Sequence, residues 1–253
     1  MHLVINTFGT SLQVANGLFA VKTKEGTKQV LPEKVRSISI GKGARISSDA
    51  ALLAIENEVD VLFVDRMGTP AGRLWSVKYG SISTIRKQQL NFSRSPQAVQ
   101  WIKTIVGDKI DNQTALLLSF GGGEANKALQ VERAVNKLAD YKQKIAQLEA
   151  PFVQDIAPTL RGWEGAASKA YWAVVGLFLP APLRFKQRTQ HPAKDLFNAL
   201  LNYGYGMLYG KVEGALIKAG LDPYLGVFHR DEYNRPVFVY DAIEKFRVWV
   251  DYV

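Results

Sequence analysis

Short apolar runs separated by turn residues dominate the first 80 residues of the chain. Runs of this length and spacing are typical of β-strands, and the nearly continuous apolar run VDVLFV is typical of a strand covered on both faces. One short helix interrupts them, with an apolar face and with Ser48 or Asp49 as its N-cap. The pattern predicts a β-rich region with strands at about 3–7, 18–22, 35–40, 59–64 and 72–77.

From residue 82 onward the apolar positions recur at helical spacing. Ser95-Pro96 predicts the start of one long helix, because proline is well tolerated in the first turn. Pro151 and Pro158 bracket the start of another helix, which carries Glu164. Further helices are expected at about 124–148, at about 195–219, where Gly220 is placed to end the helix, and from about 237 to the end.

The change of pattern near residue 80 predicts a domain boundary. We therefore expect an α+β chain with a small β-rich domain at 1–80, followed by an all-α domain at 81–253.

The composition of the chain excludes several classes of protein and favours others. The chain of 253 residues has a formal net charge of +9 and no cysteine, which excludes disulfides and thiolate metal sites. The N-terminus lacks the pattern of a signal peptide, and no apolar run is long enough for a membrane helix. We expect a cytoplasmic protein with no membrane partner. The positive charge favours a polyanionic partner such as nucleic acid, although it can also serve solubility alone.

Four residues in the helical part form the pattern of a divalent-metal site: Glu164, His229, Asp241 and Glu244. Carboxylates with an imidazole can hold a hard or borderline cation and leave positions open for water and phosphate. Asp241 and Glu244 are three apart on a predicted helix, where like charges repel unless a cation lies between them. Each residue also has an ordinary alternative: Glu164 could pair with Arg161, Lys245 or Arg247 could relieve the repulsion, and His229 could simply pack.

A polar stripe follows one side of the predicted helix at 195–219 and consists of Asn198, Asn202, Tyr205, Tyr209 and Glu213. Amide and phenol groups at these spacings could bind phosphates or bases, or the stripe could face solvent. A basic segment with Arg184 lies just before it and is a candidate for phosphate contact or a solvated loop. The candidate DNA contacts are Arg161, Lys186, Arg188, Lys194, Asn198, Asn202, Tyr205, Tyr209, Arg235 and Arg247.

Three segments, in order, resemble the motifs of the CRISPR-associated adaptation integrase and endonuclease family, Cas one (Cas1). They are LRGWEGAASKAYW, FKQRTQHPAKDLFNALLNYGYGMLY, and GLDPYLGVFH followed by DAIEKFR. The resemblance covers nearly the whole chain. It departs from the family at Asp195-Leu196-Phe197-Asn198, where the family has D-P-x-N, and at Val253, because members usually continue with further helices. We therefore expect a chain truncated at its C-terminal end.

The resemblance implies a β-sandwich-like N-terminal domain that forms a homodimer, and a helical catalytic domain. It implies metal ligands at Glu164, His229 and Glu244 for Mg²⁺ or Mn²⁺, with Asp241 as an acidic catalytic partner. It also implies a small ferredoxin-like partner, Cas two (Cas2). The implied activity joins the 3′-hydroxyl ends of captured double-stranded DNA, the prespacer, to the CRISPR repeat. Two alternatives stay open: a related transposase, and a catalytically inactive DNA-binding scaffold.

Overall fold

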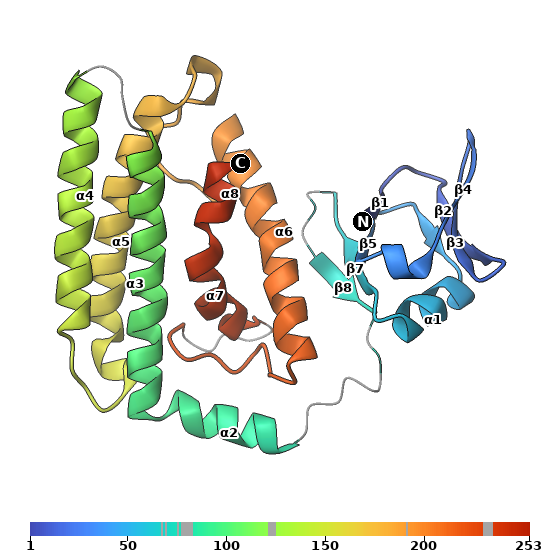
Figure 1. Ribbon diagram of the computed structural model, residues 1–253, viewed down its shortest axis with the longest axis horizontal. Helices are drawn as coiled ribbons and strands as arrows, with labels where there is room; N and C mark the ends of the chain where they lie inside the picture. Colours follow the sequence, from blue (N-terminus) through green and yellow to red (C-terminus); the bar gives the residue numbers. More distant parts are fainter. Residues whose placement is uncertain are drawn as a thin grey trace. The chain divides into compact units, whose positions relative to one another are not determined.

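The computed structural model describes residues 1–66, 68, 70–74, 76, 83–120, 125–190, 192–229 and 235–253. The chain divides into two compact units, Met1–Gly80 and Ser81–Val253. The first unit is built from strands and the second is almost entirely helical, so the expected α+β fold class is confirmed (Figure 1).

Two four-stranded sheets make up the N-terminal unit, with one α-helix between strands. In the first sheet β1 pairs with β5 and β5 with β7 in parallel, and β7 pairs with β8 in an antiparallel manner. The second sheet is antiparallel apart from the parallel pair of β2 and β6. The first sheet contains β1 (His2–Ile5), β5 (Ser37–Ile40), β7 (Asp60–Val64) and β8 (Pro70–Arg73); the second contains β4 (Gly26–Val30), β3 (Leu18–Thr23), β2 (Ser11–Ala15) and β6 (Arg45–Ile46).

The core of this unit is formed by inward-facing apolar residues of both sheets, with Leu12, Phe19, Ile38 and Val61 completely buried. Helix α1 (Ser48–Glu56) buries Ala50 and Ala54 in the same core. Its N-cap is Ser47, whose hydroxyl accepts from the backbone N–H of Ala50 at 3.2 Å. The expected cap at Ser48 or Asp49 was therefore one or two positions too late.

The predicted strands at 3–7, 18–22, 35–40 and 59–64 correspond to β1, β3, β5 and β7. The strand expected at 72–77 begins earlier, as β8, and part of the predicted range lies outside the described residues. The sequence pattern missed β2, β4 and β6. In β4 every residue except Val30 is exposed, so that strand has no apolar face to reveal it.

The helical unit contains a layer in which α3, α4 and α5 run side by side, with α7 and α8 lying between α3 and α6 (Figure 1). Its core includes Ile102, Ile110, Leu138, Leu160 and Tyr171. The α-helices are α2 (Ser83–Ser93), α3 (Pro96–Ser119), α4 (Ala125–Ala146), α5 (Val153–Phe178), α6 (Leu196–Lys218), α7 (Val237–Ile243) and α8 (Val248–Tyr252); short 3-10 turns are η1 (Pro32–Lys34) in the first unit, and η2 (Ala181–Leu183) and η3 (Glu244–Phe246) in this one.

Pro151 and Pro158 bracket the start of α5 as expected: the helix begins at Val153, and Pro158 lies within its first two turns, where it removes one backbone hydrogen bond. One expectation about these helices was wrong. The single helix expected from residue 237 is three pieces, because η3 separates α7 from α8. The end of α6 is as expected: Gly220 has φ +79° and its N–H donates to the carbonyl oxygen of Ile217 at 2.9 Å.

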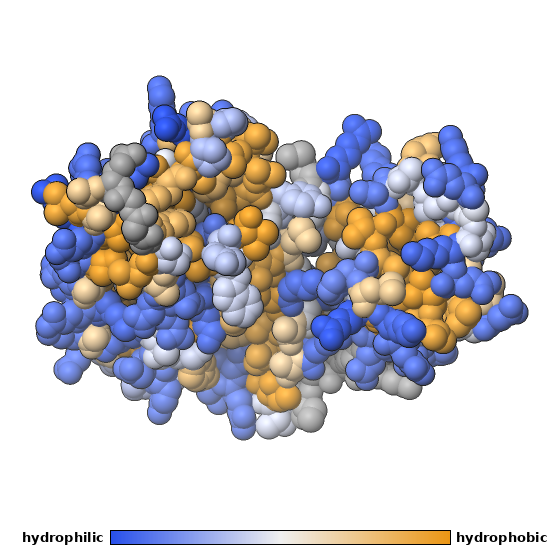
Figure 2. Space-filling view, turned by 45° about the horizontal axis from the view of Figure 1, so that its top comes forward, coloured by the Kyte–Doolittle hydropathy of each residue, from blue (hydrophilic) through white to orange (hydrophobic). Residues whose placement is uncertain are grey.

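The surface mixes hydrophilic and hydrophobic residues, and Figure 2 shows apolar side chains reaching it among charged ones. In α6 an exposed apolar stripe follows Leu196, Leu200, Tyr203 and Met207, each between 51% and 55% exposed. Among the described residues no helix is long and apolar enough to cross a membrane.

Candidate metal-dependent DNA-processing site

Glu164 lies in the middle of α5. The hydroxyl of Ser168, one turn later, donates to Glu164 Oε1 at 3.0 Å. Arg161 does not pair with it. The Arg161 guanidinium instead donates to the carbonyl oxygen of Phe228 at 3.3 Å and lies over the ring of Phe228. Glu164 therefore pairs with a different cation.

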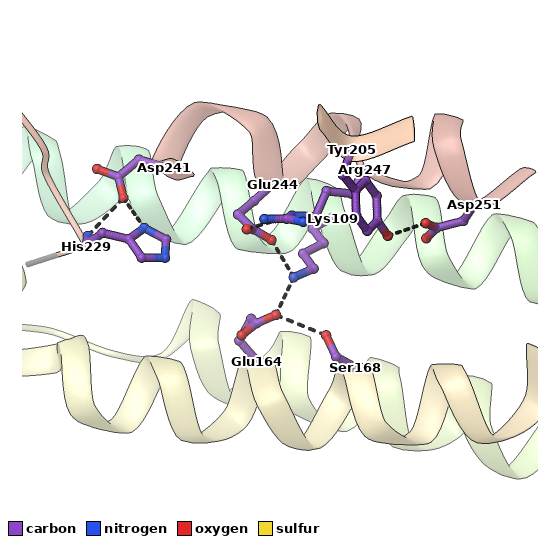
Figure 3. Close-up of polar contacts among 9 residues, drawn as sticks. All are labelled: Lys109, Glu164, Ser168, Tyr205, His229, Asp241, Glu244, Arg247 and Asp251. Atoms are coloured by element: carbon purple, nitrogen blue, oxygen red, sulfur yellow. Dashed lines mark hydrogen bonds and ion pairs between the residues drawn. The ribbon is translucent and has the colours of Figure 1, made fainter. Parts of the chain in front are cut away.

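That cation is Lys109 of α3, which is 7% exposed. Its ammonium donates to Glu164 Oε1 and, at 2.5 Å, to Glu244 Oε2 (Figure 3). Burial by itself would lower the pKa of Lys109, but Glu244 and Glu164 outweigh it and the pKa is raised. Lys109 therefore stays charged between two carboxylates that come from segments far apart in the sequence.

Glu244 opens the 3-10 turn between α7 and α8, and its side chain is 12% exposed. Arg247 donates from Nε to Glu244 Oε1 at 2.8 Å, so the two Glu244 oxygens face two different cations. Burial alone would raise the pKa of Glu244, but Lys109 and Arg247 hold that pKa at about 2. Of the two cations considered from sequence to relieve the charge of Glu244, Arg247 is the one that pairs with it.

Asp241 has a different role from the one expected of an acidic catalytic partner. It is completely buried and accepts hydrogen bonds from the backbone N–H groups of Val227, Phe228 and His229 at 2.6, 3.0 and 2.9 Å. Its Oδ1 also accepts from Nδ1 of His229 at 2.7 Å. Asp241 and Glu244 thus serve separate partners, and Asp241 fixes the His229 loop and imidazole without facing the Lys109 cluster (Figure 3).

The bond to Asp241 occupies Nδ1 of His229 and leaves Nε2 as the nitrogen for a further partner. A carboxylate that orients a histidine in this way is the usual second partner of a metal-binding imidazole. The His229 side chain is 37% exposed, whereas Asp241 is closed off from solvent. The pair is built to present an imidazole at the surface of the helical unit.

The donor atoms fit a hard divalent cation in their chemistry. Two carboxylates that converge on one cation are the ligands Mg²⁺ and Mn²⁺ prefer, and imidazole suits Mn²⁺ as well. The structure brings Glu164 and Glu244 together around Lys109. His229 belongs to the neighbouring Asp241 pair, and within the described residues no three of His, Cys, Asp and Glu gather closely enough to hold a metal ion.

Asn198 on α6 was expected to contact DNA, and this expectation is wrong. Its side chain is completely buried and its amide donates to the Gln187 carbonyl at 3.0 Å and to Asp195 Oδ2 at 2.7 Å. Its oxygen accepts from Arg188 at 2.6 Å and from the Thr189 backbone at 2.8 Å. With every polar atom satisfied internally, Asn198 ties the 187–189 segment to the start of α6.

Three more residues of the polar stripe, Asn202, Tyr205 and Tyr209, also face the protein. Asn202 accepts from Arg188 at 2.8 Å, and the Tyr209 ring packs on Tyr240 with centroids 5.3 Å apart. The Tyr205 hydroxyl donates to Asp251, and the Arg247 guanidinium lies 4.8 Å from the centre of the Tyr205 ring. Asn202 therefore contacts the segment before α6, whereas Tyr205 and Tyr209 pack against α8, Arg247 and α7, on either side of Glu244. These contacts within the protein account for the three side chains.

Asp251 in α8 is a second acid, partly buried, that the sequence did not single out. It accepts from the Tyr171 hydroxyl at 2.9 Å as well as from Tyr205. Burial raises the pKa of Asp251 to about 6, against the lowering effect of the two phenols. Burial and this carboxylate in turn raise the pKa values of both tyrosines.

The remaining basic candidates are distributed differently. Lys186 and Lys194 are exposed on the segment between η2 and α6. Arg188 is half-buried, lies over Trp172 and Tyr205, and has a pKa lowered by burial. Arg235, just before α7, is exposed and has a polar contact of its own.

Comparisons with known proteins agree with the motifs. The family model of the CRISPR associated protein Cas1 matches residues 3–253. CRISPR-associated endonuclease Cas1 1 of Archaeoglobus fulgidus is 36% identical over 260 residues, which span 98% of this chain and 74% of the relative.

Two solved structures share the fold. A chain of the Cas6-RT-Cas1–Cas2 complex matches 99% of this chain with a TM-score of 0.75 and 25% identity; this chain spans 27% of it. A casposase bound to integration product matches 99% of this chain and 70% of its own, with a TM-score of 0.77 and 19% identity, which shows the fold alone. With the family model matched from residue 3 to the last residue, and the curated relative aligned over almost the same length, the chain belongs to the Cas1 family of CRISPR-associated endonucleases.

Proposed function

We propose that this chain is a metal-dependent DNA integrase of CRISPR adaptation, which joins 3′-hydroxyl ends of a captured DNA fragment to the CRISPR repeat by transesterification. The observation that carries the proposal is the convergence of Glu164 and Glu244 on one buried cation position, beside an imidazole that Asp241 holds through Nδ1. Membership of the Cas1 family supports the same activity.

Glu164, Glu244 and His229 are the residues that would hold Mg²⁺ or Mn²⁺. Such an ion, when bound, would polarise a phosphodiester, lower the pKa of an attacking hydroxyl and stabilise the charge of an in-line displacement. The chain's own contribution is orientation. Asp241 fixes the imidazole through Nδ1, Ser168 holds one Glu164 oxygen, and Arg247 holds one Glu244 oxygen.

Duplex DNA would be held through its phosphates, as the net charge of +9 favours. The exposed Lys186 and Lys194 are the best candidates for phosphate contact, since both lie on the solvent-facing segment just before α6. Arg161 and Arg235 are further candidates near the His229 loop. We propose the prespacer and the CRISPR repeat as the two DNA partners, Cas2 as the protein partner, and a homodimer formed through the N-terminal unit.

Disintegration of a branched DNA half-site tests the proposal, because this reverse reaction needs the site but not a protein partner. We expect product with Mn²⁺ or Mg²⁺ from the unaltered chain, and none from Glu164→Ala or His229→Ala. Glu132→Ala is the matched control, since Glu132 is an exposed glutamate in the middle of α4. Full activity in Glu164→Ala would contradict the assignment.

The DNA used in the assay separates the alternatives. Preference for a branch built on a CRISPR repeat supports the adaptation integrase, whereas preference for the inverted ends of a mobile element favours a transposase. DNA binding without product, with either metal and either DNA, favours a non-catalytic scaffold.

A further inference from the structure

Lys109 places a positive charge where the proposed function needs a metal ion. Its ammonium contacts one oxygen of Glu164 on α5 and one oxygen of Glu244 in η3, while its own Cα belongs to α3 (Figure 3). The lysine side chain is 9% exposed, and the carboxylates are 24% and 12% exposed. This is an interior ion triad joining three helical segments, not a surface salt bridge.

The charges of this cluster balance without any metal. Glu164 and Glu244 bring two negative charges, and Lys109 and Arg247 bring two positive charges. A divalent ion bound by the same two carboxylates would add two positive charges at a poorly solvated position. The local excess would oppose loading strongly, since like charges at contact distance repel far more where water is excluded.

The distances also indicate that the Lys109 ammonium and a divalent ion cannot both bind between Glu164 and Glu244. The ammonium nitrogen is 2.5 Å from Glu244 Oε2, and Mg²⁺ binds carboxylate oxygens at about 2.0–2.1 Å. A nitrogen and a metal ion that each contact the same pair of carboxylates cannot occupy that space together. The flexible four-carbon stem of lysine allows the ammonium to move away while α3 stays in place.

We propose that Lys109 is a built-in counter-cation that occupies the space between Glu164 and Glu244, and that a divalent ion loads this site by displacing it. The inference rests on the proposed function, because it takes these glutamates as metal ligands. Lys109 is a positioning residue: it keeps the two carboxylates together in the metal-free protein and sets how readily an ion enters.

Mn²⁺ affinity tests the proposal without an activity assay. Titration of Mn²⁺ followed by electron paramagnetic resonance should show at least a tenfold tighter dissociation constant in Lys109→Met, because no ammonium has to leave. Lys109→Arg keeps the charge and should bind Mn²⁺ less tightly than Lys109→Met. Lys142→Met is the matched control, since Lys142 pairs with Asp111 between α4 and α3 but is exposed, and its affinity should be unchanged. Equal or weaker Mn²⁺ binding in Lys109→Met would overturn the proposal.

The native protein offers a second test that does not depend on a variant folding. Brief treatment with an amine-acetylating reagent, followed by mass spectrometry of the peptides, reports how available each lysine is. We expect acetylation of Lys109 to rise several-fold when Mn²⁺ is added, with Lys142 unchanged. An unchanged or slower reaction of Lys109 with Mn²⁺ present would overturn the proposal.

Different results would contradict the proposed metal site and the proposed displacement of Lys109. If the site is not a metal site, neither the unaltered chain nor Lys109→Met will bind Mn²⁺ in a manner that Glu164→Ala abolishes. If only the displacement is wrong, both proteins will bind Mn²⁺ through Glu164 with the same affinity.

Discussion

Asp241 holds His229 at two points with one oxygen: Oδ1 accepts from the His229 backbone N–H at 2.9 Å and from Nδ1 of its ring at 2.7 Å. The other oxygen accepts from the N–H groups of Val227 and Phe228. A single buried carboxylate therefore shapes the loop and occupies Nδ1, so that Nε2 is the ring nitrogen left for a further partner. Asp241 therefore contributes mainly to the stability of the loop, and His229 contributes the side chain that could bind a further partner.

Replacing Asp241 should damage the fold more than replacing His229. In Asp241→Asn one oxygen becomes an amide that donates, so at least one buried N–H loses its acceptor. Each such loss costs about 1–3 kcal/mol, and we expect the free energy of unfolding to fall by roughly 2–4 kcal/mol. His229→Ala removes a partly exposed ring and should cost under about 1 kcal/mol. Denaturant unfolding of both variants checks this, and equal losses would contradict the assigned roles.

Asp251 should make the protein less stable as the pH rises. Its pKa is raised from 3.8 to about 6, so the folded state holds a proton that the unfolded state has lost over this range. The associated stability is fully present below pH 3.8 and is lost as the pH rises through about 6. About two pKa units correspond to about 3 kcal/mol.

The difference in free energy of unfolding between the unaltered protein and Asp251→Asn isolates this contribution. Relative to Asp251→Asn, the unaltered protein should lose about 3 kcal/mol of its free energy of unfolding between pH 4 and pH 7.5. Tyr171, Tyr205 and Arg247 also face the carboxylate, and none of the three changes charge in that range. A pH-independent difference would contradict the burial of an ionisable Asp251.

Lys186 and Asn198 should separate DNA contact from structure. Lys186→Ala should weaken DNA binding at low salt and reduce the slope of log affinity against log salt by about 0.9, the contribution of one phosphate contact. Lys194→Ala should behave in the same way. Asn198→Ala should instead lower the free energy of unfolding by roughly 2–4 kcal/mol and leave the salt slope of the folded protein unchanged. Fluorescence anisotropy over a salt series checks both, and an unchanged slope in both lysine variants would remove them from the interface.

Two glycines of α6 should respond in opposite directions to alanine. A Cβ at Gly204 would overlap Cγ1 of Val250, so Gly204→Ala forces α6 away from α8 and should cost about 1–3 kcal/mol. Gly206 has no atom within 4 Å of the corresponding position, so Gly206→Ala should gain up to about 1 kcal/mol from helix propensity alone. Thermal unfolding of the two variants provides the comparison. Similar effects would mean that α6 and α8 are not in close contact.

Much of the fold was predictable because its signals are local. The proline at the start of α3, the glycine after α6 and the apolar runs of β3 and β7 each reflect short-range rules. Strand β4 escaped prediction because it is polar and exposed. The break at η3 escaped because the segment keeps helical spacing through Glu244, and only its packing against α3 decides where the turn tightens.

The candidate site was predictable in its acids but not in their partners. Glu164, His229 and Glu244 stand in recognisable motifs, whereas Lys109 is 55 residues from Glu164 and 135 from Glu244. A signal was present: Lys109 falls on the buried face of α3 between Val106 and Ile110, where a lysine needs an ionic partner. The prediction that Asn198 contacts DNA was wrong because the sequence does not distinguish an amide that binds DNA from one that binds a neighbouring loop.

The most direct test is a crystal of this protein soaked in Mn²⁺ and measured for anomalous scattering from manganese. We expect one strong peak between Glu164 and Glu244, with Nε2 of His229 turned towards it and the Lys109 ammonium moved away. A peak elsewhere in the helical unit, or none at these glutamates with Lys109 still bound to both, would contradict the claim that they form a metal site.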